Sequence, residues 1–225
     1  MEPVVLSLGG SVLVRDEGDT SYIRKIAKIL IGISATKKLY IVTGGGRIAR
    51  YYIKVGRDLG ADESYLDELG IDVTRLNARL LITALGDRAA HSPPRNYEEA
   101  VHAGRMHSIV VMGGVSPGIT TDAVSALLAE RVKARRLVNA TSIDGAYTAD
   151  PKKDPEARRI PKMTHKELID LVGPVAGAGP NHVFDPVGAK VLERSKISLA
   201  IVDGNDMANL RDALEGKKFK GTLVD

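Results

Sequence analysis

Short runs of β-branched and aliphatic residues alternate along the chain with longer stretches in which apolar residues recur every three or four positions. The short runs predict strands at residues 4–8, 39–43, 108–112, 137–140 and 199–202. The longer stretches predict helices over about 21–31, 48–59 and 122–133. Strand and helix in repetition require crossover connections, so the pattern predicts a mainly parallel sheet with helices on both faces.

Residues 62–85 break this alternation with one long helical stretch. Because Gly70 interrupts the apolar spacing, we expect two helical pieces that serve packing or subunit contact. Further along, Thr164 and Glu167 have the spacing of a capping box, which predicts a helix start with His165 on its surface. No linker rich in Pro, Gly or Ser divides the chain, so we expect a single domain over residues 1–225.

Composition narrows the function classes. The chain has 225 residues, is 44% hydrophobic and 27% charged, and contains no Cys, which excludes disulfides, Cys-based zinc sites and thiol catalysis. Lys and Arg are mixed with Asp and Glu at a net charge of +4, and aromatic residues are 4%. That composition disfavours a nucleic-acid partner and suits small anionic substrates. His91, His102, His107 and His182 lack metal-ligand spacing, so no metal ligands are predicted.

The sequence shows neither a membrane-spanning pattern nor a signal-peptide pattern. No apolar run reaches the roughly 18–20 residues that span a bilayer, and the first residues lack the basic and apolar regions of a signal peptide. We therefore expect a cytoplasmic protein with no membrane partner.

Three glycine clusters follow predicted strands: Gly9-Gly10, Gly44-Gly45-Gly46, and Gly113-Gly114 with Pro117-Gly118 beyond it. In an open parallel sheet, ligands bind beyond the carboxyl ends of the strands. Glycine lets backbone N–H groups approach phosphate oxygens, and a helix N-terminus adds positive partial charge. The clusters therefore predict a site for several phosphates. The Walker and G-x-G-x-x-G patterns are absent, which argues against P-loop kinases and ordinary dehydrogenases.

Five segments in this order are typical of one known family. They are residues 5–11, 42–50, 67–78, 112–123 and 140–151, the last reading Ala-Thr-Ser-Ile-Asp-Gly-Ala-Tyr-Thr-Ala-Asp-Pro. In combination they resemble the amino-acid-kinase superfamily, and within it the archaeal branch of uridylate kinases. The match covers nearly the whole chain.

The resemblance implies an α/β fold: a three-layer α/β/α sandwich with a mainly parallel central sheet of about eight strands. It implies an N-terminal lobe over about 1–134 for the phosphate acceptor and a C-terminal lobe over about 135–225 for ATP. The implied reaction is ATP plus UMP giving ADP plus UDP, with Mg²⁺, on the route to CTP. The implied assembly is a homohexamer built from dimers.

Site residues follow from the resemblance by position. The acceptor UMP would be held by Gly45, by Asp67 on the ribose, and by the loop Val115, Ser116, Pro117, Gly118, Ile119, Thr120 and Thr121. The ATP set would be Gly10, Ser11, Gly46, Arg50, Thr141, Ser142, Tyr147 and Asp150. The catalytic set would be Arg50, Asp122, which orders the catalytic cations, and Lys153, with Lys152 a further candidate cation.

Two positions depart from the family pattern. Ser7 stands where many members carry a Lys near the phosphates, and Ser142 where relatives often carry Asn. Phosphoryl transfer needs positioning and cations rather than a nucleophilic side chain. The missing Lys therefore raises the importance of Arg50, Lys153 and the metal.

Three alternatives remain open at this level. The first is a kinase of the same superfamily for another small anion, such as acetylglutamate, carbamate or isopentenyl phosphate. The second is a non-catalytic nucleotide- or oxyanion-binding protein, which the Ser7 departure favours. The third is a nucleic-acid regulator, for which the sequence offers no helix-turn-helix.

Overall fold

The computed structural model describes residues 1–15, 20–151, 153–173 and 183–225. Its central sheet has seven strands in the order β3-β2-β1-β4-β8-β9-β7, close to the expected eight. These strands are β1 (Glu2–Leu8), β2 (Lys37–Thr43), β3 (Ile109–Met112), β4 (Arg136–Thr141), β7 (Lys162–Met163), β8 (Ser198–Asp203) and β9 (Thr222–Val224). A separate antiparallel pair consists of β5 (Ala146–Tyr147) and β6 (Arg159–Ile160).

All five strands predicted from the sequence are present, and the sheet is mainly parallel. Strand β1 pairs in parallel with β2 and β4, β2 with β3, and β4 with β8, whereas β8 and β9 are antiparallel. The sheet is continuous across residue 134, because β1 and β4 are hydrogen-bonded neighbours.

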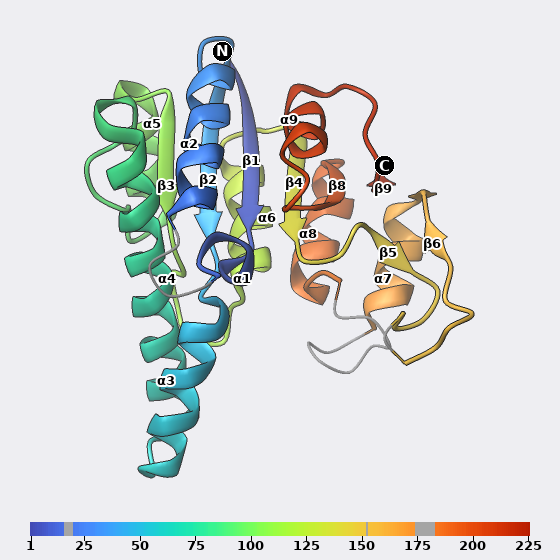
Figure 1. Ribbon diagram of the computed structural model, residues 1–225, viewed down its shortest axis with the longest axis horizontal. Coiled ribbons are helices and arrows are strands. Elements are labelled where there is room, and N and C mark those ends of the chain that lie inside the picture. Colours follow the sequence, from blue (N-terminus) through green and yellow to red (C-terminus); the bar gives the residue numbers. More distant parts are fainter. Residues whose placement is uncertain (16–19, 152, 174–182) are drawn as a thin grey trace.

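Helices cover both faces of this sheet (Figure 1). They are α1 (Gly10–Leu13), α2 (Ser21–Ile33), α3 (Gly46–Asp58), α4 (Glu63–Leu85), the 3-10 turn η1 (Gly86–Arg88), α5 (Tyr97–Met106), α6 (Thr121–Arg131), α7 (His165–Val172), α8 (Pro186–Ser195) and α9 (Met207–Glu215). Within the described residues, no helix is both long enough and apolar enough to cross a bilayer.

Two hydrophobic cores result from the period-two alternation along the strands. Leu6 and Leu8 of β1 point into one core with residues of α2, α4 and α9. Val5 points into the other core with residues of α5, α6, α7 and α8. The predicted three-layer α/β/α sandwich is therefore confirmed.

Helix α4 runs unbroken through Gly70, so the expected break into two pieces is wrong. A glycine inside a helix costs about 1 kcal/mol relative to alanine, but here tertiary packing stabilises the helix. A Cβ on Gly70 would lie 3.3 Å from the Cδ1 atom of Ile53, so the absence of a side chain lets α3 approach closely. The side chain of Asp62 caps α4 by accepting a hydrogen bond from the Tyr65 amide.

The predicted capping box is confirmed: Thr164 and Glu167 exchange hydrogen bonds at the start of α7. The surface position expected for His165 is wrong. Its side chain is buried, with Nε2 2.8 Å from the carbonyl oxygen of Ile197, just before β8. This contact gives the buried ring a polar partner.

The register of the parallel strands decides where the glycine clusters meet. Leu8 of β1 lies opposite Thr43 of β2, and Val42 lies opposite Met112 of β3. All three strands therefore end at one rim of the sheet, and the glycine clusters follow at that rim.

Candidate functional site

The turns after β1 and β2 touch backbone to backbone. A Cβ on Gly10 would lie 2.4 Å from both the Gly44 carbonyl oxygen and the Gly46 amide nitrogen. Gly46 has a φ of +62°, in the left-handed region that favours glycine. No side chain fits between these turns, so the first amides of α1 and α3 are brought to the same rim. Such helix starts attract anions.

A pocket of about 270 Å³ opens beside these turns, between α3, α4 and the loop after β3. Eight of the predicted site residues line it: Gly45, Gly46, Arg50, Asp67, Ser116, Ile119, Thr120 and Thr121. Arg50 lies one turn into α3, beyond the glycine-rich start of the helix. The pocket therefore places backbone amides and a guanidinium beside a carboxylate.

Sequence reasoning assigned no role to several residues of α4 that build this pocket. Thr74 is buried, and its Oγ1 accepts a hydrogen bond from the Gly114 amide (2.7 Å) and donates to the Ile71 carbonyl (2.6 Å). Asn77 Nδ2 donates to the Gly44 carbonyl at 2.8 Å. Helical spacing in the sequence could have identified these residues. Positions 67, 70, 71, 74 and 77 share one face of α4, and that face contacts the glycine turns.

Asp67 connects α4 to the loop after β3. Its Oδ2 accepts a hydrogen bond from the Gly118 amide at 2.7 Å, and Gly118 has a φ of +77°. The neighbouring Val115 packs, partly buried, against the core, while Ser116 Oγ donates to the Pro117 carbonyl. Val115, Pro117 and Gly118 thus shape the loop without lining the pocket.

Asp122 lies in the first turn of α6, next to Thr121 of the pocket wall. The Ser7 hydroxyl donates to its Oδ1 at 2.7 Å. Burial raises the pKa of Asp122 to about 6, and the negative charge of Asp185 acts in the same direction, while the Ser7 hydrogen bond opposes the shift. The serine that replaces the family lysine therefore contacts the predicted catalytic carboxylate.

Asp185 is a second carboxylate that sequence reasoning missed. It is buried, caps α8 through the Val187 and Gly188 amides, and accepts a hydrogen bond from Thr120 Oγ1 at 2.8 Å. Thr120 in turn caps α6. The pattern Asp-Pro before a helix was a visible N-cap signal, but nothing local placed it beside Asp122.

Gly10 and Ser11, at the start of α1, belong to the glycine turns: a Cβ on Gly46 would lie 2.6 Å from the Ser11 amide nitrogen. Of the other residues predicted for ATP, Gly46 and Arg50 line the 270 Å³ pocket, whereas Thr141, Ser142, Tyr147 and Asp150 do not line it, and neither does Lys153. Thr141 ends β4 and Tyr147 lies on β5.

Asp150 and Lys153 form one turn, in which the Lys153 amide donates to the Asp150 carbonyl at 2.9 Å and the Lys153 side chain is exposed. Ser142, between β4 and β5, is exposed. Lys152 and His182 lie outside the described residues.

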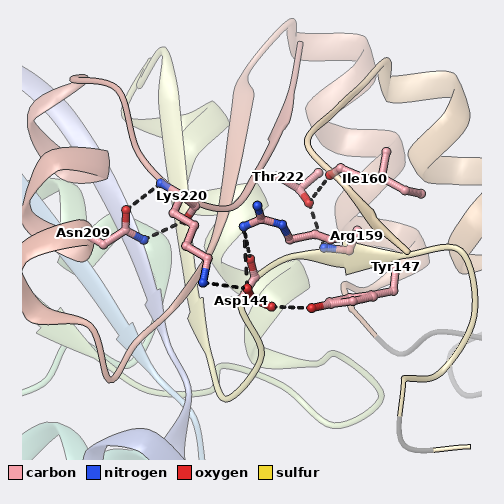
Figure 2. A network of polar contacts seen from close by, with 8 residues as sticks. Asp144, Tyr147, Arg159, Ile160, Asn209, Lys220 and Thr222 are labelled. Carbon is pink, nitrogen blue, oxygen red and sulfur yellow. Dashed lines mark hydrogen bonds and ion pairs between the residues drawn. The ribbon is translucent and has the colours of Figure 1, made fainter. Parts of the chain in front are cut away.

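Tyr147 is held by Asp144. The Tyr147 hydroxyl donates to Asp144 Oδ1 at 2.7 Å, and this hydrogen bond lowers the pKa of Asp144 below its usual range (Figure 2). Lys220 and Arg159 pair with the same carboxylate. The β5–β6 pair is therefore fixed to the C-terminal segment by charged side chains.

Oxygen ligands for a divalent cation are available at the rim, because Asp122 and Asp185 are carboxylates and Mg²⁺ prefers such ligands together with substrate phosphates. In the described part of the chain, no group of three or more His, Asp or Glu side chains is arranged to hold a metal by itself. The residues present therefore fit a cation that arrives with phosphate.

The chain matches the model of the amino acid kinase family over residues 2–203. It is 49% identical to a uridylate kinase from Methanospirillum hungatei, over 100% of this chain and 95% of the relative. It is 50% identical to a uridylate kinase from Methanoculleus marisnigri, over 100% of this chain and 96% of the relative.

Solved structures give the same likeness. The crystal structure of uridylate kinase from Archaeoglobus fulgidus is similar at a TM-score of 0.90 and 42% identity, with 100% of both chains covered. UMP kinase from Bacillus anthracis is similar at a TM-score of 0.82 and 21% identity, over 100% of this chain and 96% of that one, and bears on the fold alone.

The raised pKa of Asp122 generates a stability prediction. The folded chain binds this proton more tightly than the unfolded chain, so Asp122 lowers the free energy of unfolding as pH rises through 4 to 6. Each pKa unit corresponds to about 1.4 kcal/mol. Asp122→Asn should therefore raise the free energy of unfolding by about 1–3 kcal/mol at pH 7.5 and by little at pH 4, measured by urea unfolding.

Asp170→Asn, at an exposed position of α7, is the matched control and should change stability little at either pH. A gain for Asp122→Asn that is the same at pH 4 and pH 7.5, or no gain at pH 7.5, would contradict the electrostatic account of this carboxylate.

Proposed function

The chain belongs to the amino acid kinase family, and from this premise we propose that it is a UMP kinase, which transfers the γ-phosphoryl group of ATP to UMP and forms ADP and UDP. One observation carries the proposal. The 270 Å³ pocket is lined by the glycine turn, Arg50 and Asp67. These groups can bind the phosphate and the ribose of a nucleoside monophosphate. The chain that carries the pocket is similar over its full length to proteins named uridylate kinase.

On the acceptor side, the amides at the start of α3, at Gly45 and Gly46, bind the UMP phosphate, and Arg50 adds a positive charge one turn further on. The loop from Val115 to Thr121 encloses the uracil, and Asp67 accepts hydrogen bonds from the ribose hydroxyls. The bond between Asp67 and Gly118 supports this arrangement, because it holds the loop against the ribose-binding carboxylate.

On the ATP side, we assign residues 135–225 to the nucleotide and residues 1–134 to the acceptor. The sheet order supports this division, since β3, β2 and β1 precede residue 135 and β4, β8, β9 and β7 follow it. Gly10, Ser11, Gly46 and Arg50 face the transferring phosphates. The adenosine is held by the set Thr141, Ser142, Tyr147 and Asp150.

In the transfer itself, a UMP phosphate oxygen attacks the γ-phosphorus, and the bond to the β–γ bridging oxygen breaks. No protein nucleophile is needed, so the chain contributes position and charge. Bound with ATP, Mg²⁺ would neutralise phosphate charge, and Asp122 and Asp185 are the carboxylates that would orient it. Because Ser7 is neutral, the positive side chains at the transferring phosphates are those of Arg50 and Lys153.

We further propose a cytoplasmic homohexamer built from dimers. Support comes from the outer face of α3 and the residue that caps its end: Tyr51, Tyr52 and Val55 of the helix are 63%, 49% and 39% exposed, and Leu59 after it is 83% exposed. A face this apolar is typical of a contact between chains. Light scattering should give a particle mass of six chains, and a monomer at micromolar concentration would contradict the proposal.

The acceptor specificity can be tested directly. Purified protein with ATP and Mg²⁺ is offered UMP, CMP, isopentenyl phosphate and acetylglutamate, and ADP release is followed by a coupled assay. We expect the highest kcat/KM with UMP. Equal or higher values with another acceptor would contradict the proposal, and UMP and ATP binding in calorimetry without UDP formation would favour a non-catalytic binding protein.

Asp67→Asn tests the ribose contact. Asn keeps one oxygen that can accept from the Gly118 amide, but it loses the charge. A hydrogen bond to a charged group contributes about 1.5–3 kcal/mol, so KM for UMP should rise at least about tenfold while KM for ATP changes little. An unchanged KM for UMP would remove Asp67 from ribose binding.

A further inference from the structure

A second cleft, of about 340 Å³, lies along the segment that joins α9 to β9. Its walls carry five cationic side chains and the ring of Phe219: Arg136, Arg159, Lys217, Lys218 and Lys220. Arg136 is the first residue of β4, at the opposite end of the strand from Thr141. None of the residues lining this cleft lines the 270 Å³ pocket.

Positive charge in this cleft is only partly balanced. Asp144 Oδ2 lies 3.6 Å from Arg159 Nη1 and 3.3 Å from Lys220 Nζ, and Glu215 pairs with Lys217. Among the residues that the structure describes, Arg136 and Lys218 form no ion pair. Five cations therefore face two carboxylates, and a concave surface concentrates the resulting positive potential.

The backbone that carries the lysines is fixed. Asn209 Nδ2 donates to the Lys220 carbonyl at 2.7 Å, and the Lys220 amide donates to Asn209 Oδ1 at 2.6 Å (Figure 2). A Cβ on Gly221 would lie 2.3 Å from the Ile201 carbonyl oxygen, so the segment lies tightly against β8. Arg136 Nη1 donates to the Ala213 carbonyl near the end of α9. A ligand here would meet the positioned guanidinium of Arg136 and exposed lysine side chains that extend from a fixed backbone.

We propose that this cleft binds a small molecule with several linked phosphate groups. Arginine and lysine together suit phosphate oxygens, because guanidinium binds two oxygens in parallel and ammonium acts as a compact charge. The volume admits an oligophosphate, and the excess of about three positive charges matches the charge of that ligand class.

Ligand binding in this cleft affects the position of the β5–β6 pair, because Asp144 links the two. Arg159 and Lys220 contact both the cleft and Asp144, and Asp144 accepts the Tyr147 hydroxyl (Figure 2). An oligophosphate competes with Asp144 for these two cations and loosens the position of Tyr147. Because the proposed function places Tyr147 beside the adenosine of ATP, occupation of the cleft raises KM for ATP. This last step rests on the proposed function, whereas the binding itself does not.

The test uses inorganic tripolyphosphate and isothermal titration calorimetry on the full chain. The cleft variant is Lys217→Ala with Lys218→Ala, and the matched control removes two charges from the outer face of α2, Lys25→Ala with Lys28→Ala, all four side chains being exposed. We expect the cleft variant to bind tripolyphosphate at least tenfold more weakly than the control at the same salt concentration.

Equal affinity in the two variants would overturn the proposal, as would tighter binding of a single-stranded oligonucleotide than of tripolyphosphate in the same titration. In the kinase assay, tripolyphosphate should raise KM for ATP more in the control than in the cleft variant. If the chain proves inactive as a kinase, the calorimetric comparison still decides whether the cleft binds oligophosphate.

Discussion

The rest of the site depends on one close approach, that of the turn after β1 to the turn after β2. A side chain on Gly10 would overlap the backbone of Gly44 and Gly46, so the two turns can meet only as bare backbone. Parallel register brings them to one rim, and the starts of α1 and α3 then direct their free amides outward. Backbone amides at such a rim attract phosphate and do not require a charged side chain.

Polar contacts, two of them buried and one exposed, hold this rim in place. Asn77 satisfies the Gly44 carbonyl, Thr74 joins α4 to the Gly114 amide, and Asp67 anchors the loop at Gly118. At Asp122 the same architecture has an electrostatic cost, because burial disfavours the ionised carboxylate. Stability is thus reduced at one position that is predicted to be functional, which is common where a site needs a charge.

Local patterns predicted the strands, the glycine turns and the capping box at Thr164, because each depends on residues close in sequence. They failed at Gly70 and His165, where contacts with Ile53 and Ile197 from other elements decide the outcome. Asp185 could not be placed beside Asp122, since 63 positions separate them and only the packing of α6 against α8 brings them together. The resemblance supplied the residues predicted for the acceptor that line the pocket, but not the contacts of Thr74 and Asn77 that support it.

Amide chemical shifts of protein labelled with ¹⁵N-glycine measure the central claim most directly. On titration with UMP, the amides of Gly45, Gly46 and Gly114 should shift, while those of Gly32 in α2 and Gly86 after α4 stay in place. Shifts confined to glycines outside the rim, with Gly45 and Gly46 unmoved at saturation, would contradict phosphate binding by these turns.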